Sequence, residues 1–118
     1  MDSDLIHSGL ISYMDENFKT AVDQFSKALE KNPDNFEALV YRACSFLKLG
    51  NYSSSIDDLN KADKLKENNY EVLYNRAKAY FLSMDFTKGQ AELVRLKELS
   101  GLSEEQQSNV QSLFSRFS

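Results

Sequence analysis

Apolar residues recur along this chain at intervals of three and four residues, the spacing that places them on one face of an α-helix. The clearest stripe lies within residues 18–31, where Ala21, Phe25 and Ala28 share one side. Short polar connections separate several such stripes, which predict helices at about residues 3–14, 18–31, 36–49, 52–66, 70–83, 86–100 and 103–117. The pattern therefore predicts an all-α chain of seven helices.

Residues that favour helix ends stand between these stripes. Asn35 is predicted to cap the helix that begins at residue 36, and Gly50 to supply the left-handed turn that ends it. Gly101 is predicted to end the helix over residues 86–100 as a C-terminal cap. Ser103 and Gln106 have the spacing of a capping box at the start of the last helix.

The arrangement of large and small residues occurs three times along the chain, and corresponding positions are always the same distance apart in sequence. Small residues stand where two helices must come close, and large apolar residues fill the space between them. We therefore read residues 1–118 as a single domain with units at about 2–35, 36–69 and 70–102. When the three units are aligned, the corresponding residues are Leu5, Leu39 and Leu73; Gly9, Ala43 and Ala77; Phe18, Tyr52 and Phe86; Ala21, Ser55 and Gly89; Phe25, Leu59 and Leu93; and Ala28, Ala62 and Leu96.

A unit of this length and pattern resembles the tetratricopeptide repeat. The first unit carries the resemblance in residues 18–33, the second in both halves, and the third in residues 72–80, since Gly89 and Leu96 replace the usual alanines later in that unit. The resemblance implies a right-handed α-solenoid of antiparallel helix pairs. Solenoids need an end cap, and the apolar stripe Val110, Leu113, Phe114 and Phe117 predicts that residues 103–117 form it.

In repeats of this kind the first helix of each unit lines a concave face. The register of the repeat places twelve side chains there, eight of them aliphatic or aromatic: Ile6, His7, Leu10, Tyr13, Val40, Tyr41, Cys44, Leu47, Tyr74, Asn75, Lys78 and Phe81. One interpretation is a groove anchored by Tyr13, Tyr41, Tyr74 and Phe81, with Glu37, Lys48, Glu71 and Lys78 as rim charges. The other is tighter curvature, which buries these side chains between neighbouring first helices.

These features predict a non-catalytic protein-interaction module, an adaptor that binds an apolar or amphipathic peptide or helix of another protein. The alternative is a small structural subunit that associates with its own copy or a larger assembly. A co-chaperone that grips a chaperone tail is less favoured, because all five positions of the clamp that the resemblance would require are different here: Ile6, Leu10, Tyr41, Glu71 and Asn75. The neighbouring Arg76 is predicted to pack against its own second helix.

Composition excludes several other classes of function. The net charge of −4 and the absence of concentrated basic residues disfavour nucleic acid. The longest apolar runs, residues 38–41 and 79–82, are too short for membrane insertion. No catalytic, cofactor or metal motif is present, since His7 and Cys44 alone form neither a nucleophile site nor a zinc site. An acidic N-terminus and a single cysteine lead us to expect a cytoplasmic protein.

Overall fold

The computed structural model describes residues 2–117, and the side chains of residues 3–117. Over this range the chain forms seven α-helices and no strand. The helices are α1 (Asp2–Met14), α2 (Phe18–Lys31), α3 (Phe36–Lys48), α4 (Tyr52–Leu65), α5 (Tyr70–Leu82), α6 (Phe86–Glu98) and α7 (Glu104–Phe117). The predicted all-α architecture is therefore confirmed, and every predicted helix end lies within two residues of the observed one.

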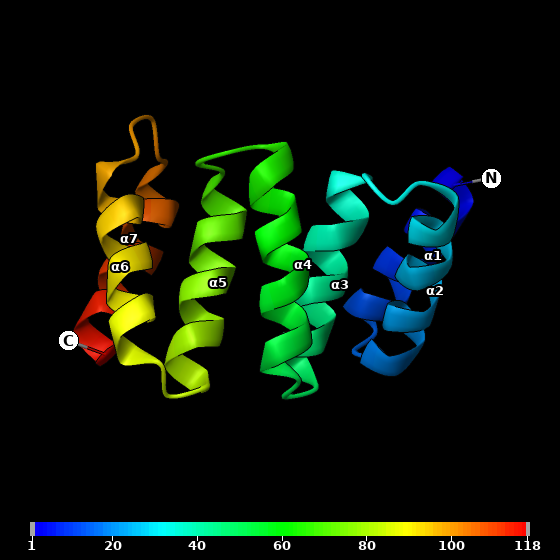
Figure 1. The fold of residues 1–118 in the computed structure, drawn as a ribbon, viewed down its shortest axis with the longest axis horizontal. Helices are drawn as coiled ribbons and strands as arrows, with labels where there is room; N and C mark the ends of the chain where they lie inside the picture. Colours follow the sequence, from blue (N-terminus) through cyan, green and yellow to red (C-terminus); the bar gives the residue numbers. More distant parts are fainter. Residues whose placement is uncertain (1, 118) are drawn as a thin grey trace.

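The helices form three antiparallel pairs that stand side by side along the longest axis of the molecule, with α7 packed at the C-terminal end (Figure 1). Each pair contacts the next through α2 on α3 and α4 on α5. The molecule measures 41 × 27 × 23 Å, because the pairs are stacked in one direction only. This is the α-solenoid arrangement that the period predicts.

Each first helix ends in the same left-handed turn, which stands at the same place in all three units. The residues in the left-handed conformation are Glu16, Gly50 and Met84, with φ values of 62°, 78° and 73°. Two residues of each turn donate backbone hydrogen bonds back into the helix, as in a Schellman motif; these include Asn17 N to Ser12 O, Asn51 N to Phe46 O and Asp85 N to Tyr80 O, each 2.8 Å long. The prediction for Gly50 is confirmed, and the repeated turn gives all three pairs the same reversal.

The other predicted helix ends include one error. The Asn35 side chain accepts a hydrogen bond from Ala38 N at 2.9 Å, so this cap is confirmed. Ser103 and Gln106 exchange hydrogen bonds of 3.0 and 3.1 Å, as a capping box requires. The prediction that Gly101 caps α6 is wrong: α6 ends at Glu98, and the extended backbone of Leu99 already leaves the helix. Gly101, with φ 76°, instead turns the connection toward α7.

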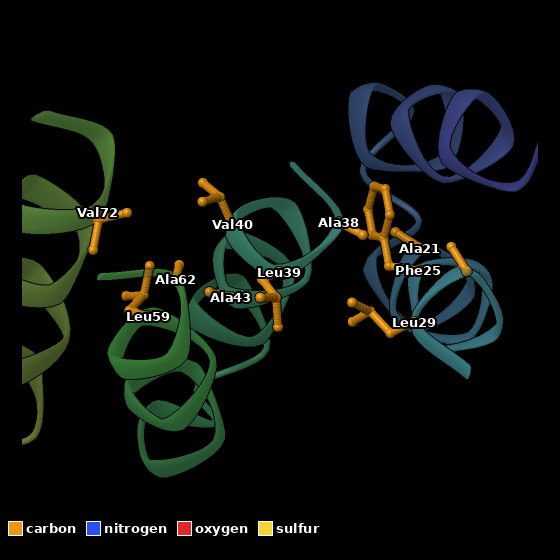
Figure 2. Close-up of a cluster of buried hydrophobic side chains, with 11 residues drawn as sticks. Ala21, Phe25, Leu29, Ala38, Leu39, Val40, Ala43, Leu59, Ala62 and Val72 are labelled. Carbon is orange, nitrogen blue, oxygen red and sulfur yellow. The ribbon is translucent and has the colours of Figure 1, made fainter. Parts of the chain in front are cut away.

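The hydrophobic core is continuous from one helix pair to the next. Figure 2 shows buried side chains of α2, α3, α4 and α5, which point into the spaces between these helices. Val72 of α5 belongs to the same cluster as Leu59 and Ala62 of α4, so the cluster crosses from the second unit into the third. A second cluster joins α5 and α6 to Val110 and Leu113 of α7. Helix α7 therefore covers the end of the core, as expected of a cap.

Large rings lie opposite glycines within two of the helix pairs. A Cβ added at Gly9 of α1 would lie 2.6 Å from the ring of Phe25 on α2. In the third pair the sizes are reversed between the helices, since a Cβ at Gly89 of α6 would lie 2.7 Å from the ring of Phe81 on α5. Both distances are too short for real contacts, so each buried ring occupies the volume that a side chain would otherwise take.

Polar contacts also recur at the period of the sequence. Arg42 of α3 makes two short contacts with the Asp58 carboxylate on α4, at 2.8 and 2.7 Å, and donates to Ser26 of α2 at 3.1 Å. Arg76 holds the same position one unit later, and its Nε lies 2.8 Å from Glu92 on α6, in its own unit. The prediction that Arg76 packs against its own second helix is confirmed. Arg76 also contacts Asp63 on α4 at 3.1 Å, so both arginines join their helix pair to the second helix of the preceding unit.

Candidate functional site

The first helices form a layer of their own, with direct contacts between α1 and α3 and between α3 and α5. Tyr13 of α1 and Tyr41 of α3 meet across this layer, with ring centroids 6.1 Å apart in an edge-to-face arrangement. Tyr41 also stacks on the buried ring of Phe25, again at 6.1 Å. Cys44, one helical turn after Tyr41, is partly buried against the same core cluster. The structure therefore brings Tyr13, Tyr41 and Cys44 together, as the register predicts.

The other predicted site residues differ widely in exposure. Ile6, Leu10, Leu47, Tyr74 and Lys78 are partly buried, and His7 is exposed. Val40 keeps only 7% of its surface exposed and Asn75 only 8%. The Asn75 side chain donates to the backbone oxygen of Glu71 at 2.7 Å, so its amide is engaged within its own helix. The stripe is therefore divided: some of these side chains are buried, and others remain at least partly exposed.

Phe81 lies elsewhere than expected. Its exposure is 1%, so it is a core residue and does not anchor a surface groove. Gly89 leaves room for the ring inside the third helix pair, and Phe117 of α7 covers the opposite side, with stacked centroids 4.5 Å apart. Tyr13 occupies the equivalent position of the first unit, but the residue that corresponds to Gly89 there is Ala21, and Tyr13 remains partly exposed. Phe81 is therefore buried because Gly89 leaves room for its ring and Phe117 covers it, whereas Tyr13 faces the larger Ala21.

Helix α7 contributes side chains that the register did not include. A pocket lies between α5 and α7, lined by Tyr74, Lys78, Leu82, Ser112, Leu113, Arg116 and Phe117. Ser112 and Arg116 are four residues apart and thus share one face of α7, beside the buried Leu113. That spacing is visible in the sequence, but the sequence does not show that this face turns toward α5.

Comparison with known proteins supports the same architecture. The family model of the tetratricopeptide repeat matches residues 25–57, from α2 into α4. The type III secretion chaperone SycD of Yersinia enterocolitica, solved with a peptide of the translocator YopD, has a TM-score of 0.89 at 12% identity, over 98% of this chain and 90% of that one. The chain has the fold of a tetratricopeptide-repeat domain, and the family model itself matches one part of it.

Two further structures share this repeat fold. The first repeat domain of human RPAP3 has a TM-score of 0.84 at 19% identity, over 98% of this chain and 91% of that one. The Sgt2 repeat domain from Aspergillus fumigatus has a TM-score of 0.84 at 17% identity, over 98% and 78% of the two chains. No curated protein matches the sequence. At these identities the likeness concerns the fold.

Charges divide the first-helix layer of the repeat domain into two ends. Glu37 and Glu71 stand in the first turns of α3 and α5, and both are exposed. Lys48 stands in the last turn of α3, and Lys78 and Arg116 line the pocket near α7. One end of the face therefore carries two acids beside Lys66, and the other end carries cations alone.

Burial dominates the titration of the central side chains. Burial is the main reason that the pKa of Tyr13 is raised to about 12, and the negative forms of Cys44, Tyr41 and Glu71 contribute smaller parts of the same rise. Burial likewise raises the pKa of the Cys44 thiol to about 11, although Lys78 opposes the shift. Both groups are therefore neutral at physiological pH, and the middle of the face presents rings and a thiol without charge.

We expect the Cys44 thiol of the folded repeat domain to react slowly with a disulfide reagent. Raising its pKa from 9.0 to about 11 lowers the thiolate fraction near neutral pH about 100-fold. The higher nucleophilicity of a more basic thiolate offsets part of this, so the rate should fall about tenfold before shielding is counted. The measurement follows the thiol that the reagent releases when it reacts with Cys44. It compares the rate for the native chain with the rate for the chain unfolded in guanidinium, both at about pH 8. Equal rates in the two states would contradict the burial of Cys44.

The described residues offer neither a metal centre nor a membrane span. Among them, no group of three or more histidine, cysteine, aspartate or glutamate side chains is placed to hold a metal ion. None of the seven helices found there is both long and apolar enough to cross a bilayer.

Proposed function

We propose that this repeat domain is a non-catalytic protein-interaction module that holds an apolar or amphipathic segment of another protein against its first helices. The observation that carries the proposal is the set of partly buried tyrosines, Tyr13, Tyr41 and Tyr74, on one layer of the solenoid. Each ring is fixed by its packing and keeps an edge at the surface. Rigid aromatic side chains of this kind lose little entropy on binding and are typical anchors at protein interfaces.

Structures of the same fold support a role in binding peptides. The first repeat domain of Spaghetti (RPAP3) was solved with the HSP90 peptide SRMEEVD, and SycD with a YopD peptide. The five clamp positions in this chain do not favour a chaperone tail, however. Exposed Glu71 would repel a terminal carboxylate, and the Asn75 amide already donates to its own helix. We therefore propose a partner segment that is recognised chiefly by its apolar side chains.

The test uses short random peptides displayed on phage and selected on the immobilised domain. Enriched peptides should carry aromatic or aliphatic residues at a regular spacing. The variant Tyr41→Glu with Tyr74→Glu should bind an enriched peptide at least about tenfold more weakly, because a charge then stands in each apolar contact. Phe86→Glu is the matched control: Phe86 is 44% exposed and begins the second helix of its pair. It should bind as the natural chain does.

Solution mass separates this module from a self-associating subunit. Light scattering over a concentration series should give a monomer for the natural chain and for both variants. If the natural chain is instead a dimer that the tyrosine variant converts to a monomer, the layer is an assembly surface between copies. Selection that enriches no peptide at all, with a chain shown to be folded by circular dichroism, would contradict the proposal of a linear segment as the ligand.

A further inference from the structure

Three cations gather toward the C-terminal ends of α3, α5 and α7, at one end of the first-helix layer. Lys78 and Arg116 line the pocket between α5 and α7, and Lys48 projects from the last turn of the adjoining α3. Within the described part of the chain, none of the three has an acidic side chain within ion-pair distance. Arg42, Arg76 and Arg95, in contrast, are all paired with carboxylates. The end of the layer therefore holds positive charge that the domain itself does not neutralise.

The positions of these cations are restricted by aromatic rings. Lys78 Nζ lies 5.5 Å from the centroid of the Tyr74 ring, and the Arg116 guanidinium lies 5.1 Å from that of Phe117. Burial, together with the charges of Lys48 and Arg116, lowers the pKa of Lys78. Like charges held close together at a partly buried position are unfavourable until an anion joins them. The arrangement thus favours a ligand that brings negative charge.

The same pocket has apolar walls. Leu82 is 39% exposed at its rim, whereas Leu113 is buried beneath it and Phe117 is partly buried. An apolar side chain could cover the exposed part of Leu82 while a neighbouring carboxylate met Lys78 and Arg116. The opposite end of the layer carries Glu37 and Glu71 beside a single cation, Lys66, so its excess negative charge disfavours a carboxylate there.

We propose that the pocket between α5 and α7 selects a partner segment with an aspartate or glutamate next to an apolar side chain, and that Lys78 and Arg116 hold the carboxylate. The inference rests on the proposed function and adds the chemistry and the direction of the segment, whose acidic part lies toward the C-terminal ends of α5 and α7. The site is distinct from the chaperone-tail clamp, because none of the five clamp positions lines this pocket. It also assigns α7 a binding role besides that of a cap.

The experiment extends the peptide selection to a charge variant, Lys78→Gln with Arg116→Gln. The natural chain should enrich peptides with an acidic residue beside an apolar one, and the variant should keep the apolar preference but lose the acidic one. The matched control is Lys19→Gln with Lys27→Gln, which removes the same charge from two exposed positions of α2. It should select the same peptides as the natural chain, and unfolding curves should show that both variants are folded.

A double-mutant cycle on one enriched peptide then locates the contact. Replacing the acidic residue of the peptide by its amide should weaken binding to the natural chain by about tenfold, and should change binding to the charge variant far less. Apolar enrichment without an acidic preference would overturn this inference and leave the proposed function standing. An acidic preference that survives in the Lys78→Gln, Arg116→Gln variant would overturn the location. If the natural chain enriches nothing, both proposals fail.

Discussion

Replacing Arg76 by alanine is expected to lower the free energy of unfolding by about 3–5 kcal/mol, the range for breaking a buried ion pair on one side. The Arg76 side chain is 7% exposed, and its Nε lies 2.8 Å from Glu92 Oε1 and its Nη2 3.1 Å from Asp63 Oδ2. Burial lowers the pKa of Arg76, but Glu92 and Asp63 raise it by more. Alanine would leave Glu92 without its closest cation, in a position with a 10% exposed side chain.

Arg42 provides the matched control, because it occupies the same place one unit earlier. Its side chain is 23% exposed and pairs with a single carboxylate, Asp58. Asp58 is itself 8% exposed, so Arg42→Ala also strands a buried carboxylate, but Arg76→Ala breaks contacts with two carboxylates and should cost more. The measurement is urea unfolding followed by far-ultraviolet circular dichroism. Equal losses for the two alanine variants would contradict a contribution from the second carboxylate.

A double variant tests whether the Glu92 carboxylate, left with only the more distant Arg95 at 3.8 Å, causes the loss. Arg76→Met with Glu92→Leu removes both partners, and Asp63 keeps Arg95 at 3.5 Å. Replacing a buried ion pair by apolar residues of similar size is often neutral or stabilising. The double variant should therefore be more stable than Arg76→Ala. If the double variant is instead less stable than Arg76→Ala, the Glu92 carboxylate stabilises the fold even without Arg76, and its burial does not explain the loss.

Phe25→Ala is the second change with a large expected effect, also about 3–5 kcal/mol. Phe25 is fully buried, lies against Gly9 and supports the ring of Tyr41. A single core of three helix pairs and a cap has little stability in reserve, so a loss of this size should populate the unfolded state. Thermal and urea unfolding measure it. Val94→Ala, at a position that is 57% exposed, should change stability by less than about 0.5 kcal/mol.

Gly9 offers a test of the geometry behind this prediction. Glycine to alanine inside a helix normally stabilises by up to about 1 kcal/mol. Here the added Cβ would lie 2.6 Å from the Phe25 ring, so Gly9→Ala should destabilise. Combining it with Phe25→Leu should recover part of the loss, because the smaller side chain leaves room for the methyl group. Independent, additive losses would show that the two residues do not share one volume.

The sequence alone predicted the helices and their faces, because these depend on local spacing. Every helix appears within two residues of its predicted ends, and the period of the sequence recurs in the turns at Glu16, Gly50 and Met84. Two of these turns have Glu16 or Met84 in place of the glycine that usually indicates a left-handed residue, so only the turn at Gly50 could be predicted from the sequence. The face shared by Tyr13 and Tyr41 followed in the same way, since the register places both of their repeat positions on the same side of the first helices.

Contacts between residues distant in sequence were decided by the tertiary structure. Phe81 belongs to the predicted face by register, yet it is buried because Gly89 leaves space on the facing helix and Phe117 covers it from α7. Arg116 joins the pocket beside Lys78 only because α7 packs against α5 at one particular angle. The repeat pattern determines which way a side chain points, and that is a local property. Whether the side chain is buried or available to a partner depends on the volume of whatever stands opposite, and the fold alone supplies that neighbour.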